Sequence, residues 1–147
     1  MIIYFSATGN CKYIARKLSD ATGEEMISVT DCIAGSRYKF EDKRIGVVTP
    51  TYFWGLPCIV REFLGKAEFV TDYLYLVATY GTTTGAVRPY AEKAMGRKFD
   101  SAFSVRMADN YTPMFDISTP GKLAKFTSHT EEEAARVVAC VLECRIR

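Results

Sequence analysis

The sequence lacks an excess of charge of either sign. Its 147 residues include 19 Lys and Arg against 17 Asp and Glu, for a net charge of +2. The basic residues are scattered, so no stripe follows a nucleic-acid backbone. No apolar run approaches the roughly 20 residues that a membrane-spanning helix needs, and no basic segment precedes the apolar start. We therefore expect a cytoplasmic protein that neither binds nucleic acid nor spans a membrane.

The sequence also lacks closely spaced pairs of cysteines and has only one histidine. The five cysteines form no C-x2-C pair, and an odd number does not suit a domain stapled by disulfides. Cys140 and Cys144 would share one face of a helix, where we expect both to pack in the core. The only histidine, His129, is expected in an exposed loop. The sequence therefore predicts reduced thiols and no metal site.

Two motifs of phosphate chemistry are absent as well. The pattern G-x4-G-K-[ST] of nucleoside triphosphate sites does not occur in the chain. Cys11 and Arg16 are spaced as C-x4-R, whereas the small tyrosine phosphatases need C-x5-R. The Asp-Pro general acid of those enzymes is missing too. Both kinds of enzyme are set aside.

What the chain does contain is enough apolar sequence for one core. Hydrophobic residues make up 48% and charged residues 24%, so residues 1–147 are predicted to form a single domain. Short apolar runs, which suit strands covered on both faces, occur at residues 2–5, 26–29, 45–48, 73–78 and 102–105.

Segments of helical spacing alternate with these runs. Apolar stripes follow Gly9, follow Pro57 and precede Gly96. A fourth helix is predicted to begin at Thr130, because three glutamates follow it as in a capping box. Residues 30–43 have poor periodicity and predict an irregular crossover or a short helix. This alternation predicts an α/β fold with a doubly wound five-stranded parallel sheet, order 2-1-3-4-5, and helices on both faces.

The first candidate site is the loop SATGNC at residues 6–11, between the first strand and the first helix. A turn entering a helix presents backbone N–H groups and a favourable dipole to phosphate. Ser6, Thr8 and Asn10 add donors, and Gly9 permits close approach of the backbone. With no Lys or Arg, the loop suits one enclosed phosphate monoester. The alternative is an ordinary turn that caps the helix.

Two further loops follow the third and fourth strands. The loop PTYFWGLP at residues 50–57 places three aromatics between two prolines and includes the only tryptophan. Such clusters indicate a partner or a flat ligand, although one of the rings could simply cover a sheet edge. The loop TYGTTTG at residues 79–85 is by itself a generic turn.

The three loops are expected to meet at one place, because ligands of such sheets bind beyond the carboxyl ends of the strands at the switch point of strand order. The first loop suits a phosphate and the other two supply aromatic walls. This combination predicts a phosphorylated ligand with a flat conjugated ring, namely FMN.

These segments resemble the flavodoxin-like family, whose phosphate loop reads [ST]-x-[ST]-G-N-[ST]. Residues 6–10 match it, whereas Cys11 replaces the usual hydroxyl residue and removes one phosphate donor. The segments IIYFSATGN, PTYFWGLP and MADNYTPMFD most resemble the flavodoxin domain of bacterial ferredoxin-flavodoxin fusion proteins. The cysteine-rich ferredoxin part is absent. The resemblance implies a flavodoxin-like fold, bound FMN and electron transfer.

The resemblance also implies which residues bind the flavin. Trp54 and Tyr80 are the leading candidates for ring stacking, with Tyr52 close behind. The Gly55 peptide is implied to flip and accept a hydrogen bond from N5 of the reduced flavin. The full cofactor-binding set is Ser6, Thr8, Gly9, Asn10 and Cys11; Pro50, Thr51, Tyr52, Phe53, Trp54 and Gly55; Thr79, Tyr80, Gly81, Thr84 and Gly85; and Asp109 and Asn110, which close over the flavin or form a simple turn.

An electron carrier needs no acid, base or nucleophile of its own, because the flavin supplies the chemistry. We therefore predict an FMN-binding electron-transfer protein without catalytic residues, working with redox proteins such as a ferredoxin or a flavoprotein reductase. Typical flavodoxins are acidic, whereas this chain has a net charge of +2 and no carboxylate in the three loops. We expect acidic partners and a less negative potential for full reduction of the flavin.

Two alternatives use the same fold, which does not by itself decide function. The first is an FMN-dependent NAD(P)H:quinone-type oxidoreductase in which residues 107–121 shape a substrate pocket. The second is a flavin-free binding or regulatory module.

Overall fold

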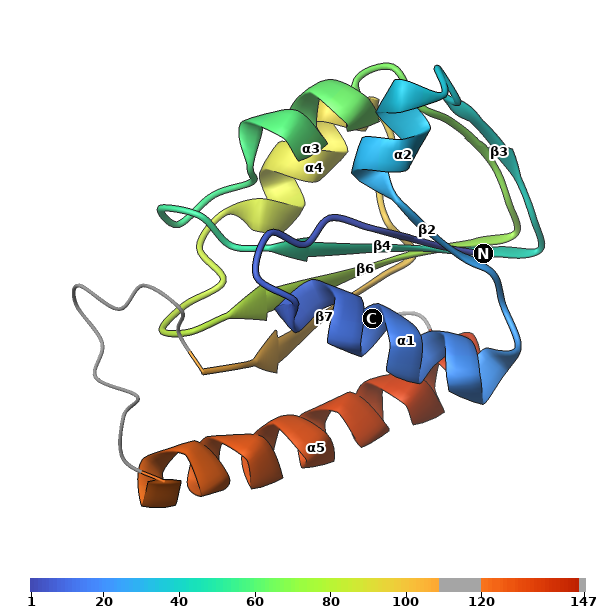
Figure 1. Ribbon diagram of the computed structural model, residues 1–147. Coiled ribbons are helices and arrows are strands. Elements are labelled where there is room, and N and C mark those ends of the chain that lie inside the picture. The colour runs from blue at the N-terminus through green and yellow to red at the C-terminus, as the bar shows by residue number, and fades with distance from the viewer. Residues whose placement is uncertain (109–119, 146–147) are drawn as a thin grey trace.

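A five-stranded parallel sheet organises the chain (Figure 1). The computed structural model describes residues 1–108 and 120–145, with the backbone alone for residues 120–126. The strand order is β2-β1-β4-β6-β7, so the main sheet has the predicted order 2-1-3-4-5 when its own strands are counted. These strands are β1 (Ile2–Tyr4), β2 (Met26–Ser28), β4 (Arg44–Pro50), β6 (Tyr73–Tyr80) and β7 (Ser101–Arg106).

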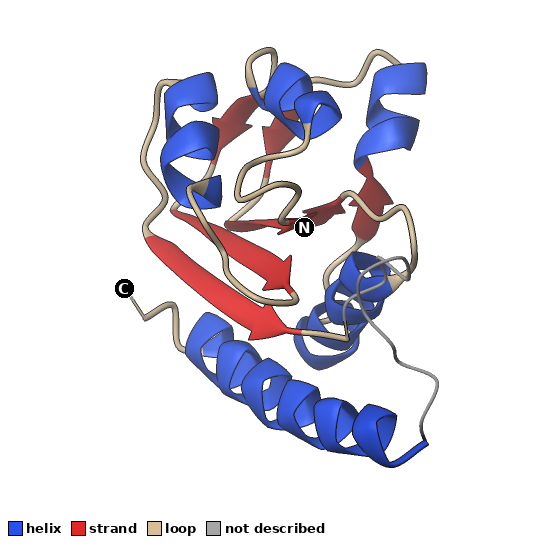
Figure 2. Cartoon of the chain, turned by 90° about the vertical axis from the view of Figure 1, so that its left-hand side faces the viewer, coloured by secondary structure: helices blue, strands red, loops and turns tan. Residues whose placement is uncertain are grey.

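Helices cover both faces of this sheet, as Figure 2 shows. On one face lie α2 (Val29–Ala34), α3 (Cys58–Leu64) and α4 (Val87–Met95), and on the other lie α1 (Asn10–Thr22) and α5 (Pro120–Leu142). Neighbouring strand residues point to opposite faces, so Ile3 and Val47 pack towards the three helices whereas Ile2 and Val48 pack towards the two. Both faces are buried, which explains the continuous apolar runs.

A second, two-stranded parallel sheet was not predicted. It pairs β3 (Lys39–Glu41) with β5 (Glu68–Val70). Phe40 and Phe69 stand opposite each other on these two strands, and their stacked rings have centroids 5.7 Å apart. Within residues 30–43, the expected short helix is α2, which Ser28 caps by accepting a hydrogen bond from the Asp31 N–H at 3.0 Å. Beyond α2, the segment forms a turn and irregular backbone at residues 35–38 and then β3.

The predicted start of the last helix at Thr130 is wrong, because α5 already begins at Pro120. The Thr130 hydroxyl donates to the carbonyl oxygen of Arg106 at 2.6 Å. Glu131 pairs with Lys17 of α1 at 2.6 Å instead of capping a helix. These residues attach the middle of α5 to β7 and α1.

Two further predictions for the C-terminal region need correction. His129 is exposed as predicted, but it lies within α5 rather than in a loop, with Nε2 3.2 Å from Glu133 Oε1. Cys140 is buried as predicted, whereas Cys144 lies beyond the end of α5 and is exposed. None of the helices in the described part of the chain is long and apolar enough to cross a membrane.

Candidate functional site

A cavity of about 660 Å³ opens at the carboxyl edge of the main sheet. Its volume lies within the range of small-molecule sites, roughly 300–1,000 Å³. No described residue that lines it is charged. The lining residues are Ser6, Ala7, Thr8, Asn10, Cys11, Pro50, Thr51, Tyr52, Phe53, Trp54, Thr79, Tyr80, Gly81, Thr82, Thr83, Met107 and Ala108.

The structure thus brings the three predicted loops together around one cavity. Four predicted residues belong to these loops without lining the cavity: Gly9, Gly55, Thr84 and Gly85. Asp109 and Asn110 lie outside the described residues. The predicted cofactor-binding set omits five residues that line the cavity: Ala7, Thr82, Thr83, Met107 and Ala108. Met107 and Ala108 directly follow β7 and belong to the segment 107–121 that only the oxidoreductase alternative placed at a pocket. Their position at the carboxyl end of the fifth strand was the signal that pointed to them.

The loop after β1 leaves the start of α1 open towards the cavity. Gly9 stands at the N-cap with φ 105°, a left-handed conformation that glycine tolerates. None of the described side chains caps α1, and its first turn contains no acidic residue. The Gly9 N–H donates to Ser6 Oγ at 3.1 Å, and Asn10 Nδ2 donates to the Ala108 carbonyl at 3.2 Å. The positive end of the helix dipole is therefore available to an anion.

Cys11 turns its thiol towards the sheet. Its Sγ lies 3.1 Å from Thr79 Oγ1, and the residue is 1% exposed. Burial raises the pKa of the Cys11 thiol to about 12, although the hydrogen bond with Thr79 acts in the opposite direction. Cys11 is thus a neutral thiol that ties the first loop to the end of β6, a contact different from the implied phosphate contact.

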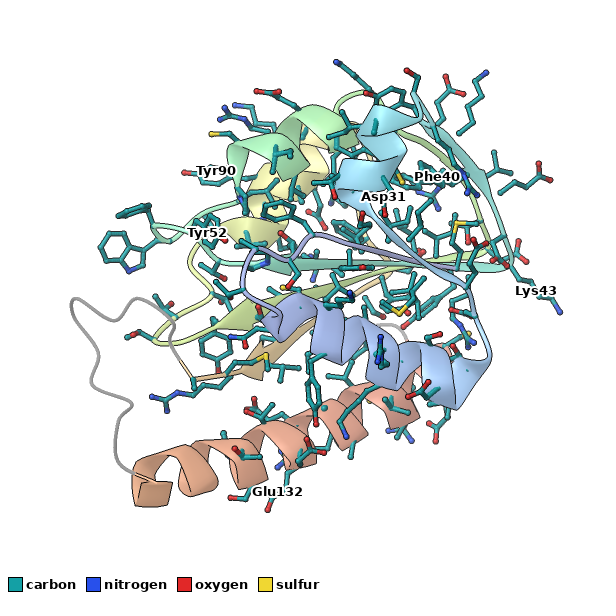
Figure 3. The ribbon with its side chains drawn as sticks, in the orientation of Figure 1. Asp31, Phe40, Lys43, Tyr52, Tyr90 and Glu132 are labelled. Atoms are coloured by element: carbon teal, nitrogen blue, oxygen red, sulfur yellow. The ribbon has the colours of Figure 1, made fainter. Side chains whose placement is uncertain are left out.

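The aromatic loop after β4 forms a tight turn. Tyr52 N–H donates to the Gly55 carbonyl at 3.0 Å, and Gly55 N–H donates to the Tyr52 carbonyl at 2.9 Å. The two central residues, Phe53 and Trp54, have φ angles of 47° and 59°. They are 92% and 66% exposed, so the idea that the rings only cover a sheet edge is wrong for both. Figure 3 shows Tyr52 at this end of the molecule.

Gly55 is enclosed by neighbours on both sides. Its own carbonyl accepts from Tyr52, and the Trp54 carbonyl accepts from the Ala86 N–H at 2.8 Å. A Cβ at Gly55 would lie 3.2 Å from Tyr90 Cε2, so the Tyr90 ring packs against it. The implied peptide flip stays a prediction, and it requires one of these carbonyl hydrogen bonds to break.

The Thr51 side chain gives the clearest indication of a ligand-binding site. Its backbone N–H donates to the Thr79 carbonyl at 2.9 Å. Its hydroxyl Oγ1 is buried in the cavity wall and has no hydrogen-bond partner among the described residues. Because buried polar groups are nearly always paired, this hydroxyl suits a polar edge of a bound molecule. Together with the uncharged aromatic walls, it fits a flavin ring.

Solved structures that are similar to this chain include proteins described in different ways. The Trp repressor binding protein from Bacillus subtilis shares 14% identity, with a TM-score of 0.56 and 96% of each chain covered. A flavodoxin from the domain Archaea shares 15% identity, with a TM-score of 0.55 over 92% of this chain and 96% of that one. An azoreductase from Bacillus anthracis str. Sterne shares 10%, with a TM-score of 0.56 over 93% and 97%.

At these identities the neighbours establish the fold alone, and no curated protein matches the sequence. The family model described as the Flavodoxin domain matches residues 1–133, which is most of the chain. The chain therefore belongs to the flavodoxin domain family, and this membership supports a flavin cofactor.

Proposed function

We propose that this protein is a cytoplasmic carrier that binds FMN in the cavity and passes electrons between redox partners. One observation carries the proposal: a cavity with aromatic walls and an uncharged described lining lies at the start of α1, which no described side chain caps. Membership of the flavodoxin domain family points to a flavin. The start of α1 favours the form of flavin that carries a single phosphate, because backbone N–H groups and the helix dipole are its anion-binding elements.

Each wall of the cavity has a distinct part in this proposal. Ser6 and Thr8 accompany the backbone N–H groups around the phosphate, while Trp54 and Tyr80 flank the ring. The Thr51 hydroxyl, which has no partner among the described residues, binds a polar atom at the ring edge. The bound flavin supplies the redox chemistry, and the protein's residues orient it and shield it from water.

The charge around the cavity determines the reduction potential that we expect for the bound flavin. No charged side chain is found among the described residues of the lining, so none of them repels an anionic, fully reduced flavin. We therefore propose a less negative potential for full reduction than in acidic flavodoxins. The net charge of +2 also favours acidic partners, such as the ferredoxin that the resemblance to fusion proteins suggests, or a flavoprotein reductase.

Titration of the purified protein with FMN tests the proposal, followed by quenching of flavin fluorescence. Riboflavin, which lacks the phosphate, should bind at least about tenfold more weakly. Thr51→Val should raise the FMN Kd about tenfold through loss of one hydrogen bond, and leave stability nearly unchanged because that hydroxyl has no partner among the described residues. The matched control Thr30→Val, at an exposed position of α2, should bind FMN normally. Absence of FMN binding would overturn the proposal.

Steady-state NAD(P)H oxidation separates the carrier from the NAD(P)H:quinone-type oxidoreductase. The FMN-loaded carrier should oxidise NAD(P)H slowly with a quinone as the only acceptor, and rapidly after a flavoprotein reductase is added. Rapid turnover by the protein alone would replace the carrier with the oxidoreductase.

A further inference from the structure

The aromatic turn adopts a conformation that its own residues disfavour. A two-residue turn with positive φ at both central positions usually contains Asn-Gly or a similar pair. Here the central residues are Phe53 and Trp54, with φ of 47° and 59°. Large side chains are strained in this region, and such strain persists only when the surrounding structure enforces it. Contacts from outside the turn are therefore expected to hold it.

The loop before α4 provides these contacts. The Ala86 N–H donates to the Trp54 carbonyl at 2.8 Å. Gly85, with φ 51°, lies directly against the same peptide. A Cβ placed on Gly85 would meet Trp54 O at 2.1 Å and Trp54 C at 2.5 Å. Both contacts involve the backbone of Trp54, which cannot swing aside as a flexible side chain does.

Gly85 combines two requirements that only glycine meets. Its left-handed φ disfavours any residue with a Cβ, and the Trp54 backbone occupies the place of that Cβ. Gly85 does not line the cavity itself. Its contacts therefore act on the site through Trp54, which does line it.

We propose that Gly85 and Ala86 are positioning residues that clamp the backbone of Trp54 and fix the aromatic turn at the mouth of the cavity. The affinity for the planar ring of FMN then depends on a contact outside the cavity. This inference rests on the proposed FMN binding. The hydrogen bond from the Ala86 N–H to the Trp54 carbonyl joins the loop after β4 to the loop after β6.

The variant Gly85→Ala tests the clamp, with Gly96→Ala as its matched control. Gly96 also has a left-handed φ of 66°, but a Cβ there would meet nothing within 4 Å. Both variants carry the same kind of backbone strain, and only Gly85→Ala collides with Trp54. We expect Gly85→Ala to raise the FMN Kd at least about tenfold. Gly96→Ala should stay within about twofold of the wild type.

Trp54 also reports on the clamp without flavin, because it is the only tryptophan. In the flavin-free protein, Gly85→Ala should change its emission maximum and its quenching by acrylamide, whereas Gly96→Ala should change neither. Equal effects of the two variants on emission and on FMN affinity would overturn the inference. Should Gly85→Ala fail to fold, hydrogen exchange of the wild type decides: the Ala86 amide must be protected, and exchange at the unstructured rate would overturn the clamp.

The outcomes also separate this inference from the proposed function. A wild type that binds no FMN overturns the proposed function and the role of the clamp in affinity. A wild type that binds FMN, together with a folded Gly85→Ala variant that binds it equally well, overturns the positioning role alone.

Discussion

The two edges of the main sheet are built in opposite ways. At the carboxyl edge the described cavity lining contains no charged side chain, and the Thr51 hydroxyl has no partner within residues 1–108 and 120–145 as described. At the amino edge, Arg44 Nε lies 2.6 Å from Glu24 Oε1, and its Nη1 donates to the Val141 carbonyl at 3.0 Å. Figure 3 shows Tyr52 and Lys43 at these opposite ends. Charged pairs thus stabilise the amino edge, whereas the described lining of the carboxyl edge is uncharged.

The largest loss of folding stability is expected from a substitution in the interior next to the amino edge. Gly46 of β4 stands beside Tyr75 of β6, and a Cβ there would lie 2.2 Å from Cζ of the fully buried Tyr75 ring. Gly46→Ala is expected to lower the free energy of unfolding by about 3 kcal/mol, because neither ring nor strand has room to move. Urea unfolding measures this loss.

Gly65→Ala is the matched control for Gly46→Ala. Gly65 ends α3 with φ −67°, and a Cβ there would have only ordinary contacts, the nearest being Arg61 O at 3.5 Å. Alanine at such a position leaves stability unchanged or raises it slightly. Equal urea midpoints for the two variants would contradict the packing of Tyr75 over Gly46.

Features that depend on a local sequence pattern could be predicted from the sequence, whereas features that depend on contacts between distant residues could not. The main strands were predictable because burial on both faces requires continuous apolar runs, and the loops were predictable because the carboxyl ends of parallel strands meet. The pairing of β3 with β5 was not, since each strand has three residues and they lie far apart in sequence. The role of Gly85 depends likewise on a through-space contact with Trp54. At Thr130 the local sequence predicts a helix cap, but Thr130 and Glu131 instead contact Arg106 and Lys17, which belong to other elements.

A smaller loss is expected from the ion pair at the amino edge. Arg44→Met keeps much of the apolar stem but removes the charge opposite Glu24, and both side chains are less than one-fifth exposed. Because Glu24 would keep only the Met1 amino group at 3.2 Å, we expect a loss of about 2 kcal/mol in the free energy of unfolding. Arg136→Met should cost less than about 0.5 kcal/mol, since its pair with Glu132 is exposed. Similar losses would mean that burial does not strengthen the Arg44 pair.

The smallest effect is expected at the carboxyl edge, from Cys11 in alkaline solution. An ordinary thiol titrates near pH 9.0, whereas burial raises the pKa of Cys11 in the folded protein to about 12. Between these values the unfolded chain releases a proton that the folded chain keeps, so folding stability falls as the pH rises. Cys11→Ser removes this titration, and its stability relative to the wild type should improve by about 1 kcal/mol between pH 8 and pH 10. Urea unfolding at both pH values measures the change, with Cys58→Ser at an exposed position as the control for replacing a cysteine by serine. An identical pH slope for Cys11→Ser and the wild type would show that the Cys11 thiol ionises as readily as a solvated one. It would then contradict the burial of Cys11 in the cavity wall at the carboxyl edge.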